Sequence, residues 1–138
     1  MEPAGIEECR RNYLERQKRR RDDQEERRLR LLRAVREAAR SLQTLGVERV
    51  LLYGSILIPH RFHERSDLDI VVYGLPAAKW TAAFLALENW PGLDQVAIDM
   101  KPGEDLPVDF LSFVEARGEV IIMGTKDVRR TRPAGANP

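Results

Sequence analysis

The stretch LLYGSILIPHRFHERSDLDIVVYG, residues 51–74, decides the fold and raises the main question about function. An apolar run stops at Gly54-Ser55, a polar loop follows, and a second apolar run opens with Asp67 and Asp69. Because a loop and not a helix joins the two runs, they are most simply neighbouring antiparallel strands. Two carboxylates thus stand where one buried strand begins, and a Gly-Ser pair stands where the other ends.

The other elements are separated by Pro and Gly, which interrupt segments of helical or strand pattern. We predict, in chain order, a helix over Glu7–Leu45, strands over Val47–Tyr53 and Asp67–Tyr73, a helix from Pro76 to Pro91, a strand over Gln95–Met100, a helix over Pro107–Arg117 and a strand over Glu119–Met123. This order predicts an α/β (α+β) fold, in which a small mixed sheet has helices packed on it.

The long N-terminal helix is predicted to have two halves of different character. Its second half carries an apolar stripe at the spacing of a helix docked on a core, formed by Leu31, Leu32, Val35, Ala38, Ala39 and Leu42. Between Arg10 and Arg28, only Tyr13 and Leu14 are apolar. We expect this first half to project into solvent or to meet a partner.

The 138 residues suffice for one domain with a sizeable core, plus appendages. We predict a long helical segment over 1–45, the domain over 46–123 and a disordered tail over 124–138. Residues 1–45 carry thirteen Lys/Arg and nine Asp/Glu, net +4, whereas residues 46–138 carry ten and thirteen, net −3. Arg and Glu are so interleaved in the helix (RRRDDQEERR) that the positive field largely cancels, which argues against nucleic-acid binding.

Cysteine usage and hydropathy indicate the compartment. Cys9 is the single cysteine, so the chain has no internal disulfide and no zinc-ligand spacing. The N-terminus lacks the apolar region of a signal peptide, and no apolar run approaches the ~20 residues that span a bilayer. We expect a soluble, cytoplasmic protein without membrane association, and the sequence leaves homo- or hetero-oligomerisation open.

The two carboxylates of the opening stretch suggest half of a metal site. Side chains alternate along a strand, so Asp67 and Asp69 point to the same face, with their bases about 6–7 Å apart. Two neighbouring ionised carboxylates need a positive charge between them, and Mg²⁺, which prefers oxygen ligands, supplies one. The plainer interpretation is that this is the polar start of a strand, with Asp67 capping a turn.

Three further residues strengthen the metal hypothesis. Gly54 lets the backbone approach a ligand closely, and the residues after it can turn N–H groups and the Ser55 hydroxyl toward a phosphate oxygen. If the strand that contains Asp99 lies beside the Asp67 strand, Asp99 completes a triad, as a metal ligand or as the base for an attacking hydroxyl. The competing acids lie in loops or at a helix start, and are Asp94, Asp105 and Asp109.

These residues resemble the signature of the DNA polymerase β type nucleotidyltransferases, and in particular the minimal nucleotidyltransferases. That family carries Gly-Ser followed by Asp-x-Asp, and the resemblance covers about Val47 to Met123. One departure is the connection of eleven residues between Ser55 and Asp67, which is one longer than is common in the family. Loops tolerate such insertions.

The resemblance implies nucleotidyl transfer with ATP as substrate and Mg²⁺ as cofactor. In such an enzyme Gly54 and Ser55 would hold the triphosphate, while Asp67, Asp69 and Asp99 would be the catalytic, metal-binding carboxylates.

The loop that joins the two strands carries two arginines and two histidines. Arg65, and also Arg61, are candidates for binding phosphates, whereas the plainer interpretation is a solvated surface role. We interpret His60 and His63 as loop residues because Mg²⁺ prefers oxygen ligands.

Minimal nucleotidyltransferases are often antitoxins paired with a HEPN-domain ribonuclease toxin. The resemblance therefore implies a toxin–antitoxin system in which the antitoxin transfers AMP to a toxin tyrosine, which is AMPylation by a protein adenylyltransferase. One alternative is an antitoxin that binds and occludes its partner with little catalysis. Another is a small-molecule nucleotidyltransferase, which would need an acceptor pocket, and the sequence shows no additional domain to form one.

Overall fold

A four-stranded mixed sheet forms the centre of the computed structural model, which describes residues 3–123. The strands are β1 (Arg49–Tyr53), β2 (Leu68–Tyr73), β3 (Ile98–Pro102) and β4 (Glu119–Met123), in the spatial order β3-β2-β1-β4. Strand β1 is antiparallel to both β2 and β4, whereas β2 is parallel to β3. The predicted antiparallel pairing of the first two strands is confirmed. The tail predicted over 124–138 lies outside the described residues.

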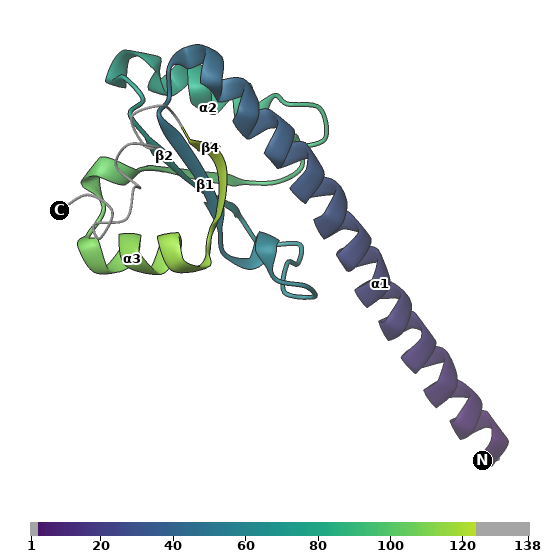
Figure 1. Ribbon diagram of the computed structural model, residues 1–138. Coiled ribbons are helices and arrows are strands. Elements are labelled where there is room, and N and C mark those ends of the chain that lie inside the picture. Colours follow the sequence, from purple (N-terminus) through teal and green to yellow (C-terminus); the bar gives the residue numbers. More distant parts are fainter. Residues whose placement is uncertain (1–2, 124–138) are drawn as a thin grey trace.

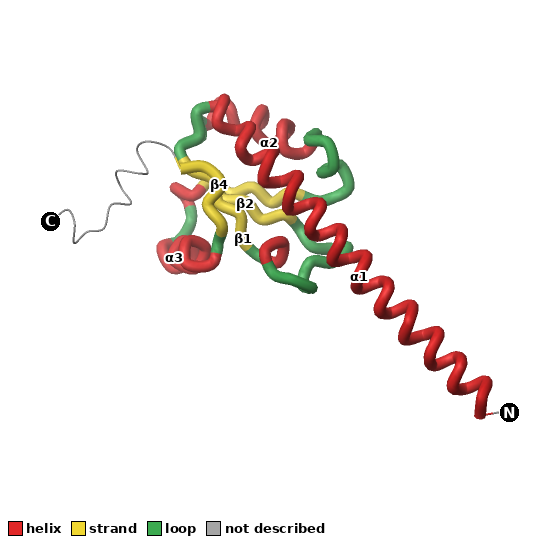
Figure 2. The backbone as a smooth tube through the Cα atoms, turned by 45° about the vertical axis from the view of Figure 1, so that its right-hand side comes forward, coloured by secondary structure: helices red, strands yellow, loops and turns green. Residues whose placement is uncertain are grey.

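Three α-helices cover the two faces of this sheet (Figures 1 and 2). They are α1 (Pro3–Ser41), α2 (Trp80–Glu88) and α3 (Val108–Arg117). Four short 3₁₀ turns accompany them: η1 (Leu42–Leu45), η2 (Ser55–Leu57), η3 (Ala77–Lys79) and η4 (Gly103–Asp105). The C-terminal part of α1 and α2 lie on one face, and α3 lies on the other. The predicted fold class, a small mixed sheet with packed helices and a long N-terminal helix, is thus confirmed.

Strand β3 lies further along the chain than predicted. The prediction is Gln95–Met100, whereas the strand runs over Ile98–Pro102. A proline has no N–H to donate to a sheet, but it is tolerated in an edge strand, and β3 is at an edge of this sheet. From the sequence alone, Pro102 predicts the end of the strand, because the sequence does not show which strand is at the edge.

Alternation along the central strands separates two apolar cores. The larger core joins β1 and β2 to α1 and α2, and its fully buried members include Val50, Leu52, Leu68, Ile70, Val35, Leu42 and Leu87. The smaller core, under α3, contains Leu51, Tyr53, Val71 and Val114. The two cores fix the register, since a shift by one residue would move the side chains of the larger core to the face of the smaller one and the reverse.

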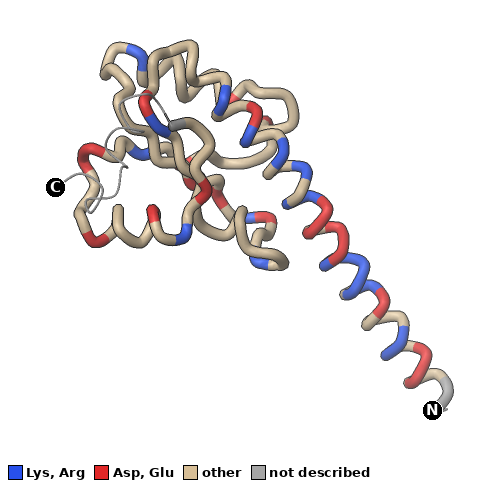
Figure 3. Tube along the Cα trace, viewed as in Figure 1, with Lys and Arg blue, Asp and Glu red and all other residues tan. Residues whose placement is uncertain are grey.

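The N-terminal part of α1 extends away from the sheet as an arm (Figure 1). From residue 5 to residue 23, every side chain except that of Gln17 is exposed. Figure 3 shows acidic and basic residues alternating along this arm. Packing begins at Gln24, and Arg28 is buried, so the exposed part ends earlier than the polar sequence suggested. Within residues 3–123, no helix has the length and apolarity to cross a membrane.

Candidate functional site

Sheet register brings one residue from each of three strands into a single row. Tyr53 at the end of β1 lies opposite Asp69 on β2, and Asp69 lies opposite Asp99 on β3. Since neighbouring strands are about 4.8 Å apart, the two carboxyl groups start from adjacent positions on one face. Strand β3 therefore lies beside β2, as the prediction for Asp99 required. The competing acids are exposed and outside the strands: Asp94, Asp105 and Asp109.

Asp69 is the carboxylate most affected by this arrangement. Its pKa is raised to about 6, chiefly by burial and next by the negative charge of Asp99, while the ammonium of Lys101 partly counteracts both. Asp67, which is exposed and directly precedes β2, adds a smaller repulsion. The raised pKa means that the ionised form of Asp69 is disfavoured without an additional positive charge nearby.

The backbone at Gly54 comes against the Asp69 carboxylate. Gly54 has φ of 85° and ψ of −158°, a conformation that is essentially restricted to glycine. A Cβ atom placed there would lie 2.5 Å from Oδ2 of Asp69. Ser55 follows, half-buried, as the first residue of η2. The Gly-Ser turn and the carboxylate row are thus in direct contact.

Lys101 supplies a cation to this row. It lies two residues after Asp99 on β3, and its ammonium forms an ion pair with Oδ2 of Asp99. Its Nζ atom also donates a hydrogen bond of 3.1 Å to the Tyr53 hydroxyl. Neither Lys101 nor Tyr53 was predicted as a site residue. The alternation along β3 was the available signal, because residues two apart in a strand share a face.

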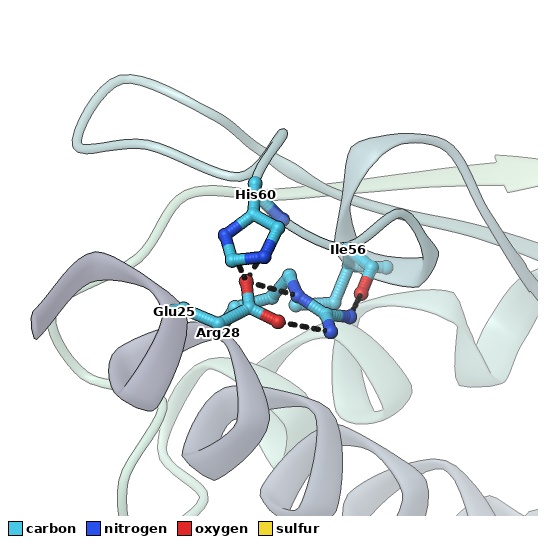
Figure 4. A network of polar contacts seen from close by, with 4 residues as sticks. All are labelled: Glu25, Arg28, Ile56 and His60. Atoms are coloured by element: carbon cyan, nitrogen blue, oxygen red, sulfur yellow. Dashed lines mark hydrogen bonds and ion pairs between the residues drawn. The ribbon is translucent and has the colours of Figure 1, made fainter. Parts of the chain in front are cut away.

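An ion-pair network ties the turn after Ser55 to α1 (Figure 4). Arg28 donates from Nη1 to the Ile56 carbonyl oxygen at 2.8 Å, and from Nε and Nη2 to the Glu25 carboxylate at 2.9 and 2.6 Å. Glu25 also accepts a 2.9 Å hydrogen bond from the backbone N–H of His60. These bonds hold the pKa of Glu25 down at about 2, with the Arg28 hydrogen bond the largest cause. The long helix therefore positions the loop that begins with Gly54-Ser55.

The loop arginines lie on the protein surface. Arg61 and Arg65 are both exposed. Arg65 borders a surface hollow of about 280 Å³ beside α1, and the other lining residues are Arg20, Gln24, His63 and Glu64. Within residues 3–123, no hydrogen bond or ion pair joins Arg65 to the three aspartates. The structure brings Gly54, Ser55, Asp69 and Asp99 together and leaves Arg65 outside this group.

The donor set of the row has the chemistry that a hard divalent cation prefers. Asp69 and Asp99 present carboxylate oxygens from adjacent positions, and Asp67 is close enough to influence Asp69 electrostatically. In the described part of the chain, no group of three or more His, Cys, Asp or Glu side chains is arranged to hold a metal ion. The arrangement thus brings together two of the three predicted ligands.

Comparison with solved structures identifies chains of the same fold. The crystal structure of a toxin–antitoxin with AMP-PNP is 18% identical with a TM-score of 0.54, and the match covers 69% of this chain and 78% of that one. A mutant of the toxin–antitoxin MntA-HpeT is 16% identical with a TM-score of 0.54, over 68% of this chain and 77% of that one. The chain matches no family profile and no curated protein. At these identities the likeness shows a shared fold, which agrees with the fold that the nucleotidyltransferase resemblance implied.

Proposed function

We propose that this protein is a Mg²⁺-dependent nucleotidyltransferase that acts as an antitoxin in the cytoplasm. It transfers AMP from ATP to a hydroxyl group of a partner HEPN ribonuclease toxin, and the preferred acceptor is a tyrosine. The observation that carries the proposal is the row in which Asp69 and Asp99 lie in register beside the Gly54-Ser55 turn. A metal-bound triphosphate needs carboxylates to hold the metal and, beside them, a turn whose backbone N–H groups can bind phosphate oxygens.

Each group then has a chemical role. Ser55 and the backbone after Gly54 bind phosphate oxygens of ATP, and Asp67, Asp69 and Asp99 would hold Mg²⁺. When bound, the metal neutralises charge on the phosphates. The toxin hydroxyl oxygen forms a bond to the α-phosphorus, the bond to pyrophosphate breaks, and the hydroxyl proton passes to a carboxylate of the row.

The two solved structures that share this fold support two parts of the proposal, namely that the protein binds a nucleotide and that its partner is a toxin. One is a toxin–antitoxin that was solved with AMP-PNP, so a nucleotide accompanies this fold there. The other carries two aspartate-to-glutamate changes that are two residues apart, which is the spacing of Asp67 and Asp69 here. Both are toxin–antitoxin assemblies, which favours a toxin as the acceptor.

The experiment that tests this function is transfer of label from α-labelled ATP to the product of the neighbouring gene, with Mg²⁺ present. We expect the double variant Asp67→Asn plus Asp69→Asn to lose at least about 100-fold in rate, since it removes two oxygen-anion ligands. The matched control is Asp94→Asn plus Asp105→Asn, two exposed acids outside the row, which should keep the wild-type rate. Label transfer that survives in the first variant would refute the assignment.

A second candidate, neutralisation by occlusion, is favoured by the exposed arm of α1. Tyr13 and Leu14 are 54% and 56% exposed on a helix that has no contact with the sheet at that position, so they offer a surface to a partner. The two mechanisms differ in their need for the carboxylates. If the double asparagine variant still neutralises the toxin fully, occlusion and not transfer is the mechanism.

A further inference from the structure

Lys101 occupies a position that the proposed reaction does not use. Register places it opposite Val71 on β2, one step along the face that carries Asp69 and Asp99. Val71 is fully buried in the smaller core, so the lysine stem runs over apolar surface and its ammonium turns back toward the acidic row. The ammonium of Lys101 therefore faces the carboxylates and remains partly exposed to solvent.

Two polar contacts hold this ammonium. It pairs with Oδ2 of Asp99 and donates to the Tyr53 hydroxyl at 3.1 Å. The Tyr53 ring is itself fixed, because it is buried and packs edge-to-face on Phe110 at 5.6 Å. The hydroxyl of a fixed tyrosine thus positions the cation at Asp99.

The position of this cation conflicts with that of a metal. A divalent ion shared by Asp69 and Asp99 would take oxygens of both carboxylates, and one of these oxygens is already paired with Lys101. An ammonium and a divalent ion within about 4 Å of each other also repel strongly in a half-buried site. Binding of a divalent ion beside the Lys101 ammonium therefore carries an electrostatic free-energy cost.

We propose that Lys101 is the resident counter-ion of the Asp69–Asp99 pair, and that it competes with a divalent cation for the Asp99 carboxylate. The proposal rests on the proposed function in one respect, namely that these carboxylates bind a divalent cation. By this arrangement the protein keeps its acidic row intact before the metal arrives, and it binds the metal less tightly than the bare carboxylates would.

Direct titration with Mn²⁺, followed by the electron paramagnetic resonance signal of the free ion, tests the competition. We expect Lys101→Met to bind Mn²⁺ about tenfold more tightly than wild type, and Lys101→Arg, which keeps the charge, to stay near wild type. Lys79→Met, a change at an exposed lysine on η3, is the matched control and should have no effect. Equal or weaker binding by Lys101→Met, or no binding by either protein, would overturn the competition.

A measurement without metal tests the counter-ion role separately and guards against a variant that folds poorly. Thermal midpoints are compared for wild type, Lys101→Met, Asp99→Asn and the double variant. We expect Lys101→Met to lower the midpoint by about 3 °C, and most of this loss to vanish when Asp99 is already asparagine. Strictly additive shifts would show that the two residues do not act as a pair.

The label-transfer assay separates failure of this inference from failure of the proposed function. If wild type transfers label and binds Mn²⁺ but Lys101→Met binds it no more tightly, the inference alone is wrong. If wild type neither transfers label nor binds Mn²⁺, the proposed function is wrong, and the metal-free cycle still decides whether Lys101 is the counter-ion.

Discussion

Gly54 is the residue on which the contact between the Gly-Ser turn and the carboxylate row depends most directly. Its φ of 85° lies in the region that L side chains avoid, and an added Cβ would meet Asp69 Oδ2 at 2.5 Å. We expect Gly54→Ala to lower the free energy of unfolding by about 1–3 kcal/mol from backbone strain and to displace Asp69 in addition. Urea denaturation measures the first effect, and nucleotide affinity measures the second.

Gly46 offers a control that separates strain from contact. Its φ of 87° is nearly that of Gly54, but a Cβ atom added there meets nothing within 4 Å. Gly46→Ala should therefore lower stability by about 1–2 kcal/mol and leave nucleotide affinity unchanged. Equal loss of nucleotide affinity in both variants would show that Gly54 acts through general stability and not through its place beside Asp69.

Local pattern was sufficient to predict some residues of the site and not others. Gly54 and the Asp67–Asp69 pair stand out because glycine at a strand end and carboxylates at a strand start are unusual locally. Lys101 and Tyr53 do not stand out, because a lysine and a tyrosine in strands are ordinary. The register of three strands, which depends on contacts distant in sequence, brings Tyr53 into the row and places Lys101 one step along the same face.

At the scale of elements, Arg28 links α1 to η2. Its side chain is buried, donates to the Ile56 carbonyl, and pairs with Glu25. Arg28→Met should lower the free energy of unfolding by about 2–3 kcal/mol, because it leaves a buried carbonyl without a donor and a carboxylate without its partner. Chemical denaturation checks the value.

Arg36 provides the matched comparison on the same helix. It makes two 2.7 Å hydrogen bonds to Glu119 of β4, but the two side chains are 38% and 34% exposed. Arg36→Met should therefore cost less than about 1 kcal/mol. If both variants lose the same stability, burial is not what gives the Arg28 network its strength.

The same network predicts how stability responds to acid. The folded-state pKa of Glu25, about 2, is below its ordinary value of 4.5, so the unfolded chain binds the proton more tightly. The stabilisation from ionised Glu25 is thus complete above about pH 4.5 and is lost as the pH falls toward 2. We expect the stability difference between wild type and Glu25→Gln, measured by urea unfolding, to shrink steadily from pH 5 to pH 2. A difference that stays constant over this range would contradict the prediction.

Element types were predictable because each segment has a clear period and is bounded by Gly or Pro. The extent of the exposed arm was not predictable, because the scarcity of apolar residues before Arg28 suggests a longer exposed segment than the structure has. In a helical pattern a charged side chain indicates exposure, whereas Arg28 is buried and pairs with Glu25 and the Ile56 carbonyl. Burial of a paired charge depends on tertiary contacts that a helical pattern does not contain.

The molecule as a whole combines a packed sheet domain with a helical arm that makes few contacts with it. Ile6, Tyr13 and Leu14 on the arm are about half exposed, and the arm has no core of its own. An isolated helix of this kind gains most of its stability from continuity with the packed half of α1. The arm therefore adds surface to the molecule and little to the stability of the sheet.

Truncation at two positions tests this division. Removal of residues 1–22 deletes, over 5–22, side chains that are all exposed apart from the half-buried Gln17, so the thermal midpoint should change by less than about 2 °C. Removal of residues 1–28 also deletes Glu25 and Arg28, and should lower the midpoint well beyond that, because the Ile56 carbonyl loses its donor. Circular dichroism melting of both proteins checks these values, and a large loss in the shorter truncation would show that the arm supports the fold. If that truncation keeps its fold and its nucleotide affinity but loses label transfer to the toxin, the arm serves to hold the acceptor.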